Sequence, residues 1–131
     1  MASHASHQGS SQMTQHLNEC ISLCLDCART CEQCGAECLH MEMQGMARCI
    51  ELCRDCADIC LLDAQFMSRH SPFHFETCRV CADVCEACAA ECERMASSHE
   101  GDMQTVLKQC ADICRRCAES CPEMATMAPA S

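Results

Sequence analysis

The sequence predicts an all-α protein: an antiparallel up-down-up-down four-helix bundle with a cysteine-lined core. Three observations predict this fold. The 19 cysteines of the 131-residue chain fall into four blocks, and the steps inside each block alternate strictly between three and four residues. That alternation is the 3.5-residue period of a helical seam, whereas the faces of a strand repeat every two residues. Turn residues separate the blocks, and short connections favour antiparallel neighbours.

The first two helices are expected from the cysteine blocks at residues 20–38 and 49–60. Gly45 lies between these blocks and is expected to end the first helix, because glycine is the common residue just past a helix C-terminus. Alanine and charged side chains occupy the positions beside the seam, as expected for helices with one buried stripe.

The third and fourth helices are expected from the blocks at residues 78–92 and 110–121. Ser71 followed by Pro72 has the pattern of a helix N-cap and first helical residue, so it is expected to open the third helix. Pro122 is expected to close the fourth helix, because the residue before a proline disfavours helical geometry.

The composition leaves little for a conventional core. The hydrophobic fraction of 49% consists largely of Cys, Ala and ten Met, with no Trp or Tyr and three Phe. So much cysteine in a short chain normally indicates a secreted disulfide scaffold. However, the amino terminus is polar and lacks the apolar stretch of a signal peptide, so a cytoplasmic location is expected. An odd number of cysteines also cannot pair completely, and thiols at i and i+4 on one helix have nearly parallel side-chain directions.

The charge and the motifs exclude several function classes. A net charge of −10 with a single lysine disfavours binding to nucleic acid or to an anionic membrane. No stretch approaches the roughly 20 apolar residues of a membrane span. No nucleophile–base pair, phosphate loop or cofactor fingerprint is visible, so an enzyme is not expected. The bundle is assigned to residues 12–125, with flexible tails at 1–11 and 126–131.

The cysteine spacing favours Cu(I) as the bound species. Soft thiolates select Cu(I), zinc or iron–sulfur clusters, but zinc and iron–sulfur sites usually draw four ligands from turns and loops. Two metal–sulfur bonds in line span about 4.5 Å. Side chains at i and i+4 have Cβ atoms about 5–6 Å apart and can converge on that separation. The chain holds nine such CxxxC pairs, with Cys78 outside them: Cys20/Cys24, Cys27/Cys31, Cys34/Cys38, Cys49/Cys53, Cys56/Cys60, Cys81/Cys85, Cys88/Cys92, Cys110/Cys114 and Cys117/Cys121.

Charge balance sets the expected capacity. One Cu(I) per thiolate gives a neutral core, whereas one divalent ion per thiolate would leave buried positive charge uncompensated. The sequence therefore predicts a capacity of about one Cu(I) per cysteine.

Extending the heptad register beyond the cysteines predicts two different bundle ends. One end collects thioether and imidazole side chains, and the other contains all three phenylalanines and resembles a plug. The first set is Met41, Met46, Met95, His99 and Met103, with His40 and Met43 nearby; the second is Leu17, Phe66, Met67, Phe73, His74, Phe75 and Met124.

The four CxxxC-rich blocks, the cysteine seam and the methionine-rich end resemble the bacterial copper storage proteins, specifically their cytosolic branch, over residues 13–124. The resemblance implies a four-helix bundle that stores many Cu(I) ions and assembles as a homotetramer. It implies that Asp63, one step past Cys60 on the seam, lies near the core, although a solvated aspartate at a helix end is the alternative. It also implies copper loading through an open end lined by Met41, Met43, Met46, Met95, His99 and Met103.

Other functions remain open at this point. A zinc or mixed-metal buffer of the metallothionein type is the main alternative, followed by an iron–sulfur electron carrier and a redox-buffering structural bundle. The amino terminus offers a smaller possibility. If Met1 is removed, Ala2-Ser3-His4 could bind Cu(II) in a square plane through its amine, amides and imidazole; the alternative is a simple tail.

Overall fold

The computed structural model describes the backbone of residues 4–41 and 45–126 and the side chains of residues 12–41 and 45–121. The described residues form four helices and no strand, which confirms the predicted all-α fold. The helices are α1 (His4–His40), α2 (Ala47–Ser68), α3 (His74–Ala96) and α4 (Gly101–Thr126).

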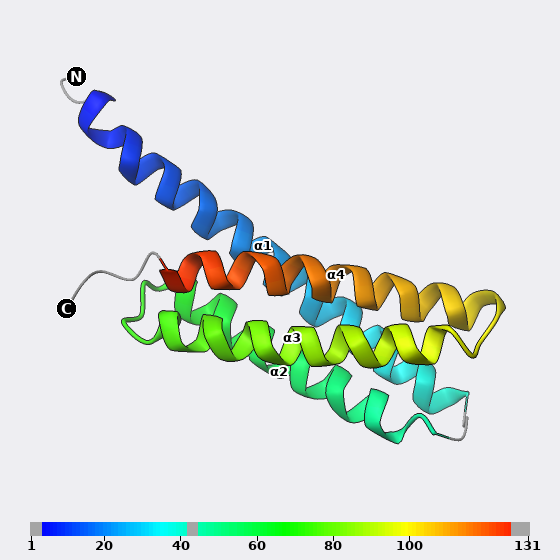
Figure 1. The fold of residues 1–131 in the computed structure, drawn as a ribbon. Coiled ribbons are helices and arrows are strands. Elements are labelled where there is room, and N and C mark those ends of the chain that lie inside the picture. Colours follow the sequence, from blue (N-terminus) through cyan, green and yellow to red (C-terminus); the bar gives the residue numbers. More distant parts are fainter. Residues whose placement is uncertain (1–3, 42–44, 127–131) are drawn as a thin grey trace.

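The helices form a bundle in which each packs against two others (Figure 1). Helix α1 contacts α2 and α4, and α3 also contacts α2 and α4, whereas the diagonal pairs are too far apart to pack. Residues 4–11, which lie in the segment expected as a tail, are helical, because α1 begins at His4. This amino-terminal part of α1 projects beyond the other three helices (Figure 1). None of the described helices is long and apolar enough to be a candidate membrane span.

Two helix ends differ from the sequence-based prediction. Helix α3 begins at His74, not at Pro72. The Ser71 hydroxyl accepts a hydrogen bond from the Phe73 backbone N–H at 3.2 Å, and the Ser71 carbonyl accepts one from the His74 N–H at 3.2 Å, so this segment forms a turn before the helix. Helix α4 continues through Pro122 to Thr126. A proline removes only one backbone donor, and the preceding residue is held in the helix by its buried core contacts.

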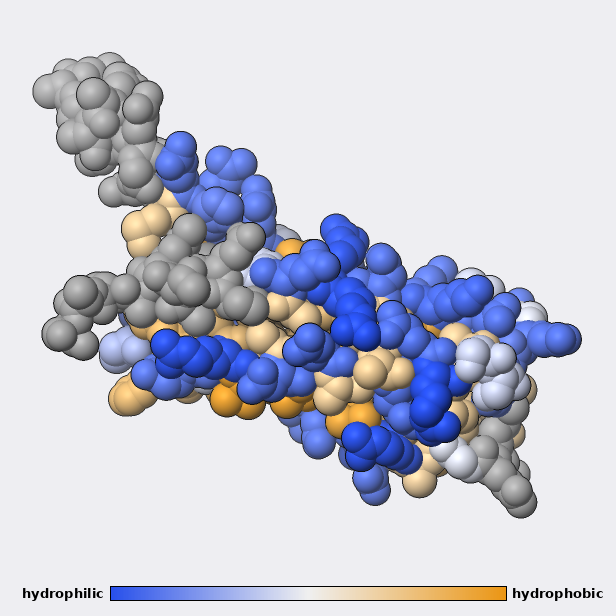
Figure 2. Space-filling view, viewed as in Figure 1, coloured by the Kyte–Doolittle hydropathy of each residue, from blue (hydrophilic) through white to orange (hydrophobic). Residues whose placement is uncertain are grey.

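Cysteine fills the core as predicted. Every one of the 19 cysteines is at most 1% exposed, and the remaining fully buried side chains are mainly alanine and methionine. Leu107 is the one leucine buried among the described residues. Polar and charged side chains cover most of the face shown in Figure 2, with apolar residues in small groups between them. The interior of the bundle is therefore packed mainly with cysteine side chains.

Candidate metal centre

The cysteines of α1 and α4 face each other in regular pairs. Their side chains are buried, and in each pair the two sulfur atoms lie within van der Waals contact or a weak S–H···S hydrogen bond. The Sγ–Sγ distances are 3.8 Å for Cys20–Cys121, 3.6 Å for Cys24–Cys117, 3.7 Å for Cys27–Cys114 and 3.7 Å for Cys31–Cys110.

The cysteines of α2 and α3 form a second set of pairs. Their Sγ–Sγ distances are 3.8 Å for Cys49–Cys92, 3.8 Å for Cys53–Cys88, 3.6 Å for Cys56–Cys85 and 3.6 Å for Cys60–Cys81. In all eight pairs of both interfaces the two residue numbers have the same sum, so one antiparallel register governs both interfaces. Cys56 joins the two sets, because its sulfur lies 3.8 Å from that of Cys27 and 3.9 Å from that of Cys114.

This register arranges the core in layers that take one side chain from each helix. The three central layers contain four cysteines each, and the layers beyond them contain fewer. The central layers are Cys24/Cys60/Cys81/Cys117, Cys27/Cys56/Cys85/Cys114 and Cys31/Cys53/Cys88/Cys110; on one side follows Cys20/Asp63/Cys78/Cys121, and on the other Cys34/Cys49/Cys92/Leu107 and then Cys38/Met46/Met95/Met103. Asp63, Leu107 and three methionines thus occupy the positions that a complete cysteine lattice would fill, which explains the odd cysteine count. We call this array the sulfur column.

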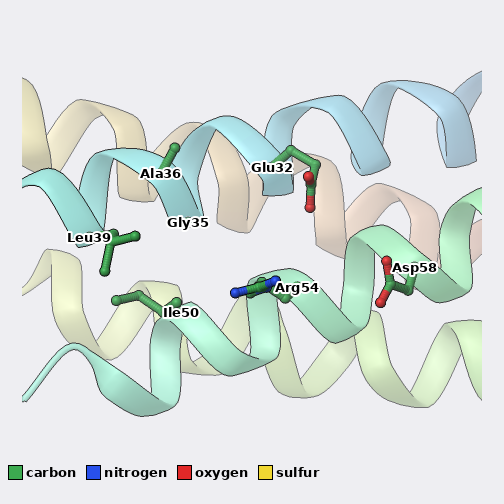
Figure 3. A pocket seen from close by; sticks show the side chains of 7 residues that line it. All are labelled: Glu32, Gly35, Ala36, Leu39, Ile50, Arg54 and Asp58. Carbon is green, nitrogen blue, oxygen red and sulfur yellow. The ribbon is translucent and has the colours of Figure 1, made fainter.

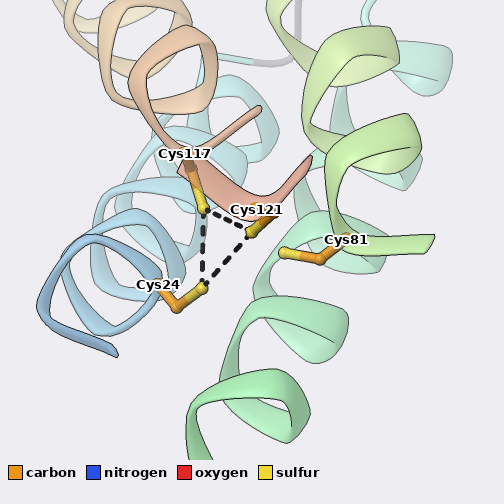
Figure 4. Close-up of side chains that lie close together, drawn as sticks. All are labelled: Cys24, Cys81, Cys117 and Cys121. Atoms are coloured by element: carbon orange, nitrogen blue, oxygen red, sulfur yellow. Dashed lines mark hydrogen bonds between the residues drawn. The ribbon is translucent and has the colours of Figure 1, made fainter. Parts of the chain in front are cut away.

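Figure 4 shows one cluster near an end of the column, formed by Cys24, Cys81, Cys117 and Cys121. The Cys24 sulfur lies 3.6 Å from that of Cys117 and 4.0 Å from that of Cys121, and all four sulfurs lie within 4.8 Å of one another. These distances are far longer than a disulfide bond of about 2.0 Å, and every cysteine is a free thiol. They are compatible with metal ions that bridge neighbouring sulfurs.

Hydrogen bonds between neighbouring thiols lower the pKa of some cysteines and raise the pKa of others. Hydrogen bonds from surrounding thiols, first of all that of Cys121, lower the pKa of Cys117, whereas donation to Cys117 and burial raise the pKa of Cys121. A hydrogen bond from Cys114 is the main cause that lowers the pKa of Cys56 to about 7. A thiolate in the column is thus stabilised by the S–H groups around it. Cations that enter the column could therefore replace the thiol protons one at a time, because each new thiolate accepts hydrogen bonds from the thiols around it.

Asp63 lies inside the column, fully buried, and is not a solvated helix-end residue. Its carboxylate accepts a hydrogen bond from the Thr77 hydroxyl at 2.6 Å and lies 3.3 Å from the Cys78 sulfur. The other oxygen lies 3.7 Å from the sulfurs of both Cys24 and Cys121. Burial raises the pKa of Asp63 to about 6, and the Thr77 hydrogen bond opposes that rise. The site therefore offers one carboxylate group among thiols.

The structure gathers only part of the expected methionine and histidine set. Met46, Met95 and Met103 are buried at the column end, with exposures of 1%, 4% and 7%. Met41 is 53% exposed in the turn after α1, contrary to its assignment to the seam. His99 is half-buried, and its Nδ1 lies 2.6 Å from the backbone carbonyl of Met95. Met43, together with Ala2 and Ser3 of the amino-terminal motif, lies outside the described residues.

Sequence reasoning missed two polar residues beside the column. Thr77 holds the Asp63 carboxylate, and only its position directly before Cys78 could have indicated this. Glu91 is 6% exposed and makes two hydrogen bonds with the Arg94 guanidinium, at 2.9 and 2.5 Å. Hydrogen bonds from Arg94 lower the pKa of Glu91. The spacing of three residues between Glu91 and Arg94 was the available signal.

The bundle also has a groove on its outer surface between α1 and α2 (Figure 3). Its lining mixes charged side chains with small and aliphatic ones and contains no cysteine. The lining residues are Glu32, Gly35, Ala36, Leu39, Ile50, Arg54 and Asp58. This groove therefore offers no sulfur ligand, in contrast to the sulfur column.

Comparison with known proteins agrees with this geometry. The chain is 42% identical to the apo form of copper storage protein 3 from Bacillus subtilis. The match covers 82% of this chain and 97% of the Bacillus subtilis protein, with a TM-score of 0.72. The Cu(I)-bound copper storage protein BsCsp3 is 41% identical over 84% of this chain and 98% of its own, with a TM-score of 0.73. A cytosolic copper storage protein from Streptomyces lividans, solved with five coppers, is 32% identical over 88% of this chain and 97% of its own, with a TM-score of 0.78.

Sequence comparison gives the same assignment. The uncharacterized cysteine-rich protein YhjQ of Bacillus subtilis is 41% identical over 88 residues, which are 66% of this chain and 82% of that protein. The model of the copper storage protein family matches residues 13–126. The chain belongs to the copper storage protein family.

Proposed function

We propose that this chain stores and buffers Cu(I) in the cytosol, that its cysteine thiolates hold the ions, and that it is not an enzyme. The observation that carries the proposal is the unbroken sulfur column, in which each cysteine pair of the two interfaces brings its sulfurs within 3.6 to 3.8 Å. Sulfurs this close can be bridged by ions of low coordination number, and one Cu(I) for each thiolate keeps the buried core neutral.

One observation favours zinc as a second candidate. Groups of four sulfurs within 4.8 Å of one another, such as Cys27, Cys31, Cys56 and Cys114, match the ligand number of tetrahedral zinc. However, Cys27 and Cys56 also belong to a second such group with Cys60 and Cys85, so zinc ions in both groups would have to share these two thiolates. Cu(I) carries a single charge, so one ion for each shared thiolate leaves the buried core neutral, whereas one divalent ion for each thiolate does not.

An anaerobic titration separates the two metals. The reduced protein would be titrated with Cu(I) in the presence of a chromogenic Cu(I) chelator, and in parallel with zinc. We expect the copper titration to end near the number of cysteines, which is 19, and copper to displace zinc. An end point of roughly four ions, the number that four-coordinate sites would allow, would refute storage by bridged thiolates.

We also propose that copper loads through the end formed by Met46, Met95 and Met103. Neutral thioethers are soft ligands that can bind Cu(I) and then release it to the thiolates deeper in the column. Met41 and His99 would contribute on the outer side of this end, and Met43, which lies outside the described residues, is included by its place in the sequence.

Loading kinetics test this end. Replacing Met46, Met95 and Met103 together by leucine keeps the volume and removes the sulfur ligands. The variant is expected to take up Cu(I) several-fold more slowly and to reach the same capacity. Met13→Leu is a matched control, because Met13 is 48% exposed and lies on α1 outside the column. Uptake rates of the triple variant equal to those of the control would argue against loading at this end.

Finally, we propose assembly as a homotetramer. Several aliphatic side chains on three helices are exposed in the single chain and would be covered by neighbouring copies. They are Leu25, Leu61, Leu62 and Val80, with exposures between 39% and 49%. Native mass spectrometry of the apo protein is expected to show four copies, and a monomer at micromolar concentration would contradict the proposal.

A further inference from the structure

The column continues beyond Asp63 with ligands other than cysteine. On α3, His74 precedes Cys78 by four residues, which repeats the spacing of the CxxxC pairs. On α2, Met67 follows Asp63 by the same spacing. The register of the eight cysteine pairs places Met67 opposite His74. An imidazole and a thioether therefore form the next layer at the end of the bundle where α2 connects to α3, opposite the methionine cluster.

His74 has an unsatisfied nitrogen in this layer. Its Nδ1 atom is buried and has no hydrogen-bond partner, although the ring as a whole is half-buried. Buried polar atoms are nearly always paired, and an unpaired one indicates a strained site or a missing water or ion. Burial is the main cause that lowers the pKa of His74, the charge of His70 lowers it further, and the charge on a Cys20 thiolate opposes this shift. A neutral imidazole nitrogen is a metal ligand.

Two sulfur atoms, those of Met67 and Cys78, lie in or next to the layer that contains His74. Met67 is fully buried, and its Sδ atom lies 3.9 Å from the Cys78 sulfur. The Thr77 hydroxyl, which donates to Asp63, also lies 3.0 Å from the His74 carbonyl oxygen. This contact ties the first turn of α3, and with it the backbone of His74, to the acidic layer.

We propose that His74 Nδ1, Met67 Sδ and Cys78 Sγ form a Cu(I) site with mixed nitrogen and sulfur ligands, which closes the sulfur column at the α2–α3 end. One thiolate and two neutral ligands give a neutral three-coordinate Cu(I) complex, which a buried position can hold. The site gives the store a second terminal position, at the end away from the methionine cluster. The inference rests on the proposed Cu(I) storage function.

Nuclear magnetic resonance tests the site directly, because Cu(I) is diamagnetic. The protein would be labelled with ¹⁵N at histidine, reduced, and titrated anaerobically with a Cu(I)–acetonitrile complex, while the ultraviolet thiolate-to-copper absorption is followed on the same sample. At saturation we expect the Nδ1 resonance of His74 to move to a metal-bound position. The exposed His70, four residues earlier, is the internal control, because its ring nitrogens should not move to a metal-bound position.

The possible results are distinct. Rising thiolate-to-copper absorption with an unchanged His74 resonance would overturn this inference and leave the storage function standing. Absence of that absorption would refute the storage function itself. In a second measurement, His74→Ala is expected to hold one Cu(I) fewer than the wild type, and His70→Ala the same number. Equal capacity of both variants would also count against the site, and the wild-type spectra decide if His74→Ala fails to fold.

Discussion

Asp63→Asn changes one charge inside the column and little else. Asparagine has nearly the same size and keeps an oxygen that can accept the 2.6 Å hydrogen bond from Thr77. Its amide can donate toward the sulfurs of Cys24 and Cys121, which lie 3.7 Å from the carboxylate. What the substitution removes is the ability to ionise, so the apo protein should lose the part of its pH dependence that Asp63 causes.

The size of this pH dependence follows from the shift in the pKa of Asp63. Burial raises the pKa of Asp63 from 3.8 to about 6, which corresponds to about 3 kcal/mol. Between these two pH values the native state binds more protons than the unfolded state, so stability falls as the pH rises. The apo wild type should therefore lose up to about 3 kcal/mol between pH 4 and pH 7 from this group. The asparagine variant should not, so it should be similar to the wild type at pH 4 and more stable at pH 7.

Urea unfolding of both apo proteins, followed by circular dichroism under anaerobic reducing conditions from pH 4 to pH 7.5, measures this difference. Contributions from the thiols that do not contact Asp63 cancel in the comparison, because both proteins have the same cysteines. Asp58→Asn, at an exposed position of the same helix, serves as a control that should leave the pH dependence unchanged. A constant stability difference between Asp63→Asn and the wild type at all pH values would refute the reasoning, as would a difference that shrinks as the pH rises.

Three further changes can be predicted from the layers. Leu107→Cys gives a fourth thiol to a layer that has three, so a Cu(I) titration should end about one ion higher, and an unchanged capacity would argue against the layer assignment. The apo protein should lose about 2 kcal/mol of unfolding free energy in urea, because a buried leucine is shortened. Gly35→Ala should stabilise the apo protein by about 1 kcal/mol in the same assay, because the new Cβ would lie 3.6 Å from that of Cys53, an ordinary contact, inside a helix; a loss of stability would mean that this space is not free. Glu91→Gln should cost about 1 kcal/mol, since it weakens the paired hydrogen bonds with Arg94, and this cost should shrink on acidification as the carboxyl protonates; a cost independent of pH would contradict an ionic role.

The sequence predicted the helices and the cysteine core because a 3.5-residue period is a direct property of helix geometry. The same extrapolation was less successful past the helix ends. Met41 lies in the turn that follows α1, and Phe73 is 64% exposed in the turn before α3. A register has no meaning once the helix ends, so a plug containing Phe73 could not be inferred from spacing. Where the helices end depends on capping contacts such as that of Ser71.

The surroundings of Asp63 required information from more than one helix. Its burial depends on Thr77 of α3 and on cysteines of α1 and α4, and a single-helix pattern does not show how neighbouring helices are aligned. A signal for that alignment was present, however. The cysteine steps read forward from one end of the chain mirror those read backward from the other, and this mirror spacing defines the layers.

The layered column has a consequence for the size of the store. Because each layer takes one residue from each of the four helices, the array can be extended along the axis of the bundle. Inserting one heptad at matching positions in all four helices would lengthen the bundle by about 10 Å and add two layers, with room for up to eight more thiols. Capacity in this architecture is therefore a matter of length, and a longer chain could hold more metal without any change in cross-section, topology or ligand chemistry.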